Sequence, residues 1–153
     1  MAVKVKTKSF GEIEVDENVI FDFPDGILGF DYIKKFVLLD SDGNNSPFKW
    51  LQAYDEVNLA FVVIMPIDFL DEYDLVISQN DLEAVGADNP NDLLVFAIVT
   101  IPADTSKMTA NLQGPLILNP KKKIGRQAIS LSDKYGVRHN ILEELNKSSV
   151  KER

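Results

Sequence analysis

Apolar and polar residues alternate at the start of the chain with the period of two that is typical of a half-buried strand. The alternation covers residues 3–7 and returns at residues 12–15, on the two sides of a turn that contains Gly11. This pattern predicts a β-hairpin. Its valine and isoleucine side chains would share the buried face, while lysines on one strand would lie opposite glutamates on the other.

Short runs rich in β-branched and aromatic residues follow the hairpin, each bounded by Gly, Pro, Asn or Asp. Many short strands at such spacing predict a sandwich or a barrel. Two of the runs end at Pro66 and Pro102, and we expect both strands to leave the sheet there because proline cannot donate to the ladder. The predicted strands lie at residues 19–23, 36–39, 48–54, 59–65, 74–78, 93–101, 109–112, 116–118 and 124–131.

Helical character is confined to two stretches. Residues 78–85 predict a short helix that is capped by Ser78 or Asn80 and closed by Gly86. Residues 137–146 carry apolar residues at helical spacing, which predicts a longer helix packed on the barrel.

A single domain is expected over residues 1–153, because no linker or compositional break divides the chain. We expect an all-β fold, mainly antiparallel and barrel-like, with one or two short helices, the longer at the C-terminus. Residues 147–153 are polar and predict a frayed tail. Two glycines in the segment from Pro24 to Phe30 predict a turn pressed against the core.

Charge narrows the range of partners. The net charge is -8, and the residues from position 11 to position 88 include eighteen acidic and three basic ones. Proteins that neutralise phosphates are basic, so we expect no direct nucleic-acid binding. An acidic face suits a basic protein partner, although solvated surface charge explains such clusters as well.

Candidate chemistry is sparse. Cysteine is absent, which excludes disulfides, thiolate metal sites and thiol nucleophiles. Common phosphate-loop, dinucleotide, nucleophile-elbow and zinc-protease motifs are absent too, and the one histidine, His139, falls in the predicted C-terminal helix. Residues 40–44 resemble the start of a calcium loop, but position 45 is Asn and position 51 is Leu, so a polar turn is expected. We therefore expect no cofactor, no metal and no enzymatic activity.

Localisation follows from the apolar runs. The N-terminal residues lack an apolar signal core. The longest apolar run, residues 93–103, is shorter than the ~20 residues that a membrane helix needs. We expect a cytoplasmic protein with no membrane partner.

Four segments taken together resemble the flagellar assembly factor FliW family. They are Phe23 to Phe30, Phe48 to Gln52, Leu59 to Pro66, and Asn111 to Asn119 followed by Gly125 to Gln127. The resemblance runs in order over nearly the whole chain. One departure is Gly114, where the family pattern leads us to expect Ala before the proline.

The resemblance implies a barrel-like protein without catalytic activity that binds flagellin and also the RNA-binding translational regulator CsrA. Flagellin that accumulates would occupy the protein and release CsrA, which then represses flagellin synthesis. A basic regulator fits the acidic charge of this chain. Two other classes stay open: a small-ligand carrier that uses the barrel mouth, and a hydrolase built on the carboxylates of residues 68–74.

Candidate partner-binding residues combine aromatic, acidic and amide side chains. The segment from Ile67 to Tyr73 mixes apolar and acidic residues, which suits a docking edge, unless Phe69 and Leu70 point inward. Phe48 and Trp50 share one strand face and suit core or interface about equally. The amides suit partner contacts or the capping of buried backbone. The candidates are Phe48, Trp50, Gln52, Asp68, Phe69, Asp71, Glu72, Tyr73, Asn111 and Gln113.

Overall fold

A computed structural model describes residues 2–8, 10–40, 47–70, 73, 76–130, 136, 138–141 and 143. Strands dominate the elements of this part of the chain. In order they are β1 (Ala2–Thr7), β2 (Gly11–Asp16), η1 (Glu17–Val19), β3 (Ile20–Asp22), β4 (Lys35–Asp40), β5 (Phe48–Ala53), β6 (Ala60–Ile64), η2 (Pro66–Asp68), α1 (Gln79–Ala84), η3 (Pro90–Asp92), β7 (Leu94–Thr100), η4 (Thr105–Lys107), β8 (Thr109–Ala110), β9 (Leu116–Asn119), β10 (Ile124–Gln127) and β11 (His139–Asn140), where η is a 3-10 helix.

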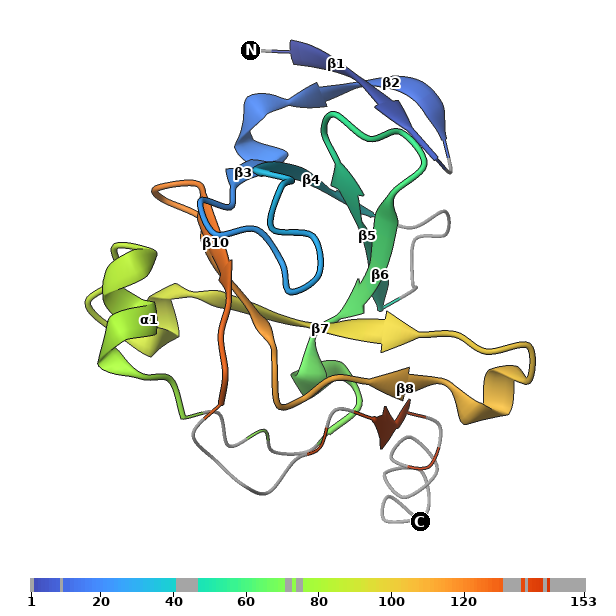
Figure 1. Ribbon diagram of the computed structural model, residues 1–153, viewed down its shortest axis with the longest axis vertical. Helices are drawn as coiled ribbons and strands as arrows, with labels where there is room; N and C mark the ends of the chain where they lie inside the picture. Colours follow the sequence, from blue (N-terminus) through green and yellow to red (C-terminus); the bar gives the residue numbers. More distant parts are fainter. Residues whose placement is uncertain are drawn as a thin grey trace.

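The sheet closes on itself. Strands β7, β6, β5, β4, β3, β10 and β9 pair in that order, and β9 pairs back with β7 (Figure 1). The β3–β10 pair is parallel, and the other pairs around the ring are antiparallel. The prediction of a mainly antiparallel, barrel-like all-β fold is therefore confirmed.

Alternation along the strands fills the barrel. Phe36, Leu51 and Val63 belong to the interior cluster, whereas their chain neighbours Val37 and Ile64 belong to clusters on the outside. Aromatic rings occupy much of the interior, and the rings of Phe23 and Phe36 meet edge to face at 4.9 Å between centroids. The interior that the described strands enclose is thus packed with side chains rather than hollow.

The N-terminal hairpin covers one outer face of the barrel (Figure 1, blue). Val5 pairs with Ile13 across β1 and β2, and Lys4 pairs with Glu14, as the alternation predicts. Val5 packs on Val37, while Lys4 and Glu14 are exposed. Period-two alternation thus determined both the register and the buried face.

Helix α1 covers a second outer face, at the left of Figure 1. The Ser78 hydroxyl accepts a hydrogen bond from the Asp81 N–H at 3.1 Å, and Gly86 adopts a φ of +70° just after the helix. Leu82 and Val85 pack with Ile117 of β9. The predicted helix, its Ser78 cap and its glycine stop are confirmed.

The structure corrects the bounds of two predicted elements. Residues 76–78 form no strand, because they lead directly into the cap of α1. His139 lies in β11 and not in a helix, since it pairs with Ala110 at the edge of β8. Ile141 is helical and fully buried, as the predicted apolar stripe requires. The other helix-stripe residues, the tail at 147–153 and the turn at 41–46 lie outside the described residues.

Candidate functional site

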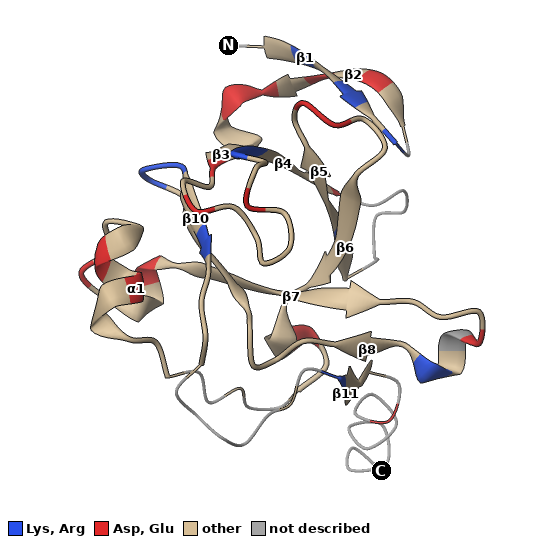
Figure 2. Ribbon diagram, viewed as in Figure 1, with Lys and Arg blue, Asp and Glu red and all other residues tan. Residues whose placement is uncertain are grey.

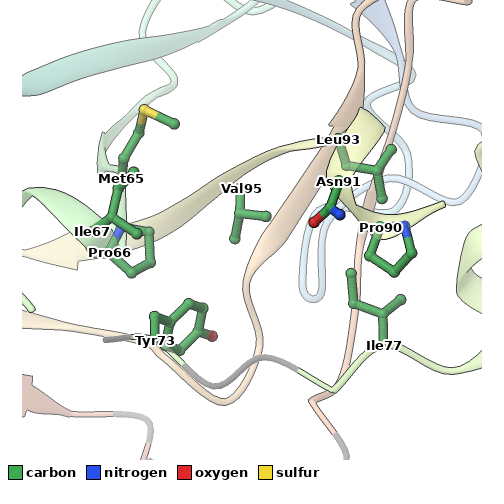
Figure 3. Close-up of a pocket in the computed structure, with 9 residues that line it drawn as sticks. All are labelled: Met65, Pro66, Ile67, Tyr73, Ile77, Pro90, Asn91, Leu93 and Val95. Carbon is green, nitrogen blue, oxygen red and sulfur yellow. The ribbon is translucent and has the colours of Figure 1, made fainter. Parts of the chain in front are cut away.

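An apolar groove lies where the chain leaves β6 and approaches β7 (Figure 3). Its volume is about 350 Å³. Met65 belongs to the barrel interior, Tyr73 to the cluster beneath η2, and Leu93 to the cluster beneath α1. The groove therefore opens where three apolar clusters of the protein meet at the surface.

The first wall of the groove is the exit from β6. Pro66 has no N–H to donate and sits at the first position of η2, so the strand stops there, as predicted. The 3-10 turn then presents Ile67 outward with 66% of its surface exposed. Ile67 therefore contributes an accessible apolar side chain to the lining of the groove.

The second wall is the approach to β7. The Asn89 side chain accepts a hydrogen bond from the Asn91 N–H at 2.9 Å, and Pro90 occupies the first turn of η3. These contacts fix η3 opposite Met65 and Ile67, with Val95 between the two walls (Figure 3). Asn91 places a side-chain amide among otherwise apolar neighbours.

Tyr73 closes the groove on a third side. Its hydroxyl donates a hydrogen bond to the carbonyl oxygen of Leu112, a residue that is itself fully buried. The ring packs against the cluster that contains Phe69 and Leu70. Tyr73 therefore serves the fold with its hydroxyl and offers its ring to the groove.

The structure decides between the two orientations that the sequence left open for the segment after Pro66. Phe69 is 2% exposed and Leu70 is 8% exposed. Both of their N–H groups donate to the Pro66 carbonyl oxygen, which turns the chain back onto the barrel. Phe69 is therefore a core residue, whereas Asp68 is exposed near the groove. Asp71 and Glu72, like Asp74, lie outside the described residues.

Phe48 and Trp50 share one face of β5, as the alternation predicts, and the structure shows that this is the outer face of the barrel. Both are half-buried: Phe48 packs against the cluster beneath η2, and Trp50 against the cluster beneath the hairpin. Together with Ile101 they border a second hollow, of about 200 Å³. This smaller hollow is an alternative place for an apolar side chain.

The candidate amides mainly serve the fold. Gln52 is 1% exposed, accepts a hydrogen bond from the Lys8 N–H at 2.9 Å and so ties the hairpin turn to β5. Asn111 accepts hydrogen bonds from the N–H groups of Gln113 and Gly114. Gln113 is exposed, and its own carbonyl oxygen accepts from the Ser130 N–H.

Acidic residues are spread over β2, η1, the β5–β6 turn and α1, while Lys121, Lys122 and Lys123 form a basic turn between β9 and β10 (Figure 2). Away from the groove, the pKa of Asp104 is lowered because its carboxylate accepts hydrogen bonds from the Ser106 hydroxyl and N–H. Among the described residues, no group of His, Asp or Glu is placed to hold a metal ion.

The helices that the structure describes are short. Along the part of the chain that the structure describes, none of them is long and apolar enough to cross a bilayer.

Sequence reasoning missed half of the groove. Three of its lining residues are Ile77, Pro90 and Asn91. The sequence pattern places Ile77 in a predicted strand and the other two in a loop after the predicted helix. The available signal was local: Asn89-Pro90 predicts a turn. Only the fold brings that turn opposite Met65.

The chain is similar to known proteins of one family over most of its length. The family model described as FliW protein matches residues 4–141. A flagellar assembly factor FliW of Treponema denticola is 46% identical over 94% of this chain and 97% of its own length, and one of Leptospira biflexa is 45% identical over 97% of both. A crystal structure of the flagellar assembly factor FliW superposes with a TM-score of 0.81 at 34% identity, covering 91% of this chain and 96% of the other.

Proposed function

This chain belongs to the FliW protein family, and on that premise we propose that it is a cytoplasmic flagellar assembly factor that binds flagellin and CsrA alternately. Its relatives carry the name of an assembly factor and not of an enzyme. Flagellin that occupies the protein would release CsrA to repress flagellin translation. Export of flagellin would make the protein available to CsrA again.

The apolar groove carries the flagellin part of the proposal. The ends of flagellin are amphipathic helices that pack into a coiled core in the filament, so before export they expose apolar stripes that a chaperone must cover. A hollow of about 350 Å³ between Ile67 and Asn91 suits one or two such side chains. The Asn91 amide would pair with a polar group at the edge of the helix.

The acidic surface supports the CsrA part. RNA-binding regulators are basic, and an acidic protein both attracts them and repels the phosphates that they bind. The chain carries a net charge of -8. The charge alone does not select a docking surface, because acidic residues lie on several faces (Figure 2).

A small-ligand carrier is the second candidate function, and the groove is large enough for a small apolar molecule. The barrel interior gives this candidate no support, because residues such as Phe36 and Leu51 fill it. Native mass spectrometry of the purified protein separates the two functions: a co-purified small molecule supports the carrier, whereas a complex with added flagellin supports the assembly factor.

The test of the groove is flagellin binding by Ile67→Asp, measured by isothermal titration calorimetry. We expect a loss of about tenfold or more, because a partner that buries this side chain forfeits roughly 1.5 kcal/mol and must also desolvate a carboxylate. The melting temperature should stay within a few degrees, since Ile67 is exposed.

Val57→Asp is the matched control, because Val57 is also an exposed β-branched residue but lies in the β5–β6 turn. It adds the same charge and should leave flagellin affinity unchanged. Equal losses in both variants would mean that charge and not the groove decides binding. Unchanged binding by Ile67→Asp would move the search to the smaller hollow beside Phe48.

A further inference from the structure

Leu28 is the most exposed of the large apolar side chains that the structure describes, at 84%. It occupies the second position of a β-turn in which the Phe30 N–H donates to the Ile27 carbonyl oxygen at 2.6 Å. Gly29 at the third position has a φ of +85°, as a type II turn requires. The expectation of a turn pressed against the core therefore holds for Ile27, which is 2% exposed, and fails for Leu28.

Side chains from β10 and β6 hold the turn in place. The Gln127 side chain accepts a hydrogen bond from the Leu28 N–H at 2.9 Å and donates one to the Gly114 carbonyl oxygen at 3.0 Å. The Phe30 ring packs edge to face on the Phe61 ring, with 5.3 Å between centroids. A side chain presented by such a fixed turn loses little entropy when a partner binds it.

A second exposed apolar residue stands near the turn. Ile129 is 58% exposed, and together with Leu28 it borders a hollow of about 460 Å³. Two exposed carboxylates, those of Asp25 and Asp31, line the same hollow. The surface thus presents two aliphatic side chains around an acidic depression.

The charge of the depression remains negative after its own ion pairs are counted. Arg126 pairs with Asp25 and also donates to Asp81 at 2.8 Å, so one guanidinium serves two carboxylates. Asp31 adds a further exposed carboxylate to the lining, so Asp25, Asp31 and Arg126 leave the depression with one net negative charge. A partner that places a lysine or arginine here, flanked by apolar side chains, would match both features.

We propose that the surface formed by Leu28, Ile129, Asp25 and Asp31 is the docking site for a basic protein partner, into whose apolar pocket Leu28 inserts. The inference rests on the proposed function, in which CsrA is the basic partner. It gives that partner a surface distinct from the flagellin groove.

Two separate anchors are compatible with alternate binding. A typical interface covers about 800 Å² on each partner, so it extends well beyond a single anchoring side chain. The segment around α1 borders both sites, since Asp81 holds Arg126 while Ile77 and Asn91 line the groove. Two partners centred on the two anchors would therefore compete for the surface around α1.

The experiment measures CsrA and flagellin binding separately for the full-length chain and for Leu28→Ser. We expect about a tenfold weaker affinity for CsrA, as for an interface anchor, with flagellin affinity within twofold of the original. Val57→Ser is the control, because Val57 is an aliphatic residue with 39% of its surface exposed in the β5–β6 turn, away from both sites. Melting temperatures should be equal for all three proteins.

The possible outcomes test the docking site around Leu28 separately from CsrA binding itself. An original chain that binds flagellin but not CsrA overturns the regulator part of the proposed function. If the original chain binds CsrA and Leu28→Ser binds it equally well, the docking site is overturned while the proposed function stands. A loss of flagellin binding in Leu28→Ser also overturns the site assignment.

Discussion

The groove and the Leu28 turn are both apolar surfaces, but one is concave and the other convex. The groove is built from side chains that also belong to the clusters of the fold, such as Tyr73 and Leu93. Leu28 belongs to none of these clusters and stands on a turn that the Gln127 side chain holds in place through the Leu28 N–H. Substitutions of groove residues that belong to these clusters, such as Tyr73 and Leu93, therefore mix stability with binding, whereas a substitution of Leu28 or of the exposed Ile67 separates the two.

The largest expected effect comes from Gly26, whose backbone supports the convex site. Gly26 has a φ of +67°, and a Cβ there would lie 2.5 Å from the Asp31 Cα, a backbone atom that cannot yield without moving the turn. We expect Gly26→Ala to lower the free energy of unfolding by about 2 kcal/mol or more, measured by urea denaturation. CsrA binding should fall with it.

Gly29→Ala is the matched variant for this test. Gly29 has a φ of +85°, but a Cβ there would meet no atom within 4 Å. Only the cost of the left-handed conformation remains, about 1 kcal/mol. If the two variants were equally stable, the close approach to Asp31 would not hold the turn, and the description of a rigid convex site would be wrong.

The two sites also differ in how well sequence predicts them. The hairpin and α1 were predictable because their signals are local: alternation for the one, and Ser78 with Gly86 for the other. The groove was not, because Met65 and Asn91 meet only after the barrel closes. Leu28 was not either, since Ile27 and Leu28 are both apolar and only the turn geometry decides which one is buried.

The C-terminal segment is another region that the local sequence pattern did not predict correctly. Apolar residues at helical spacing predicted a helix through His139, but His139 and Asn140 pair with β8 instead. The Ile141 N–H donates to the Met108 carbonyl oxygen at 3.1 Å and extends this contact. An unpaired strand edge outweighed the local preference of the segment, and no local pattern reports such an edge.

The second prediction concerns the groove wall. Tyr73→Phe removes the hydroxyl that donates to the Leu112 carbonyl oxygen. Leu112 is fully buried, so its carbonyl oxygen is left with one hydrogen-bond donor fewer. We expect the free energy of unfolding to fall by about 1 kcal/mol. Flagellin affinity should change less than this, because the ring that faces the groove remains.

Tyr32→Phe is the comparison for this hydroxyl. Tyr32 is 65% exposed and lies just after the Leu28 turn. Because water solvates its hydroxyl, its removal should change the free energy of unfolding by less than about 0.5 kcal/mol. If both substitutions lowered the free energy of unfolding equally, the Tyr73 hydroxyl would contribute no more to the fold than an exposed one. The distinction between the groove and the turn would then be wrong.

The smallest expected effect is electrostatic and concerns Asp31. Its carboxylate is exposed in the depression beside Leu28, so it should attract a basic partner electrostatically before the two proteins touch. We expect Asp31→Asn to slow CsrA association about twofold at low salt, measured by stopped flow, and to have little effect once the Debye length falls to about 8 Å at physiological ionic strength. Asp55→Asn removes the same charge from the exposed β5–β6 turn and should slow association less. Equal slowing by both variants would mean that CsrA responds to the net charge of the chain, and Leu28 would then be the sole evidence for where CsrA docks.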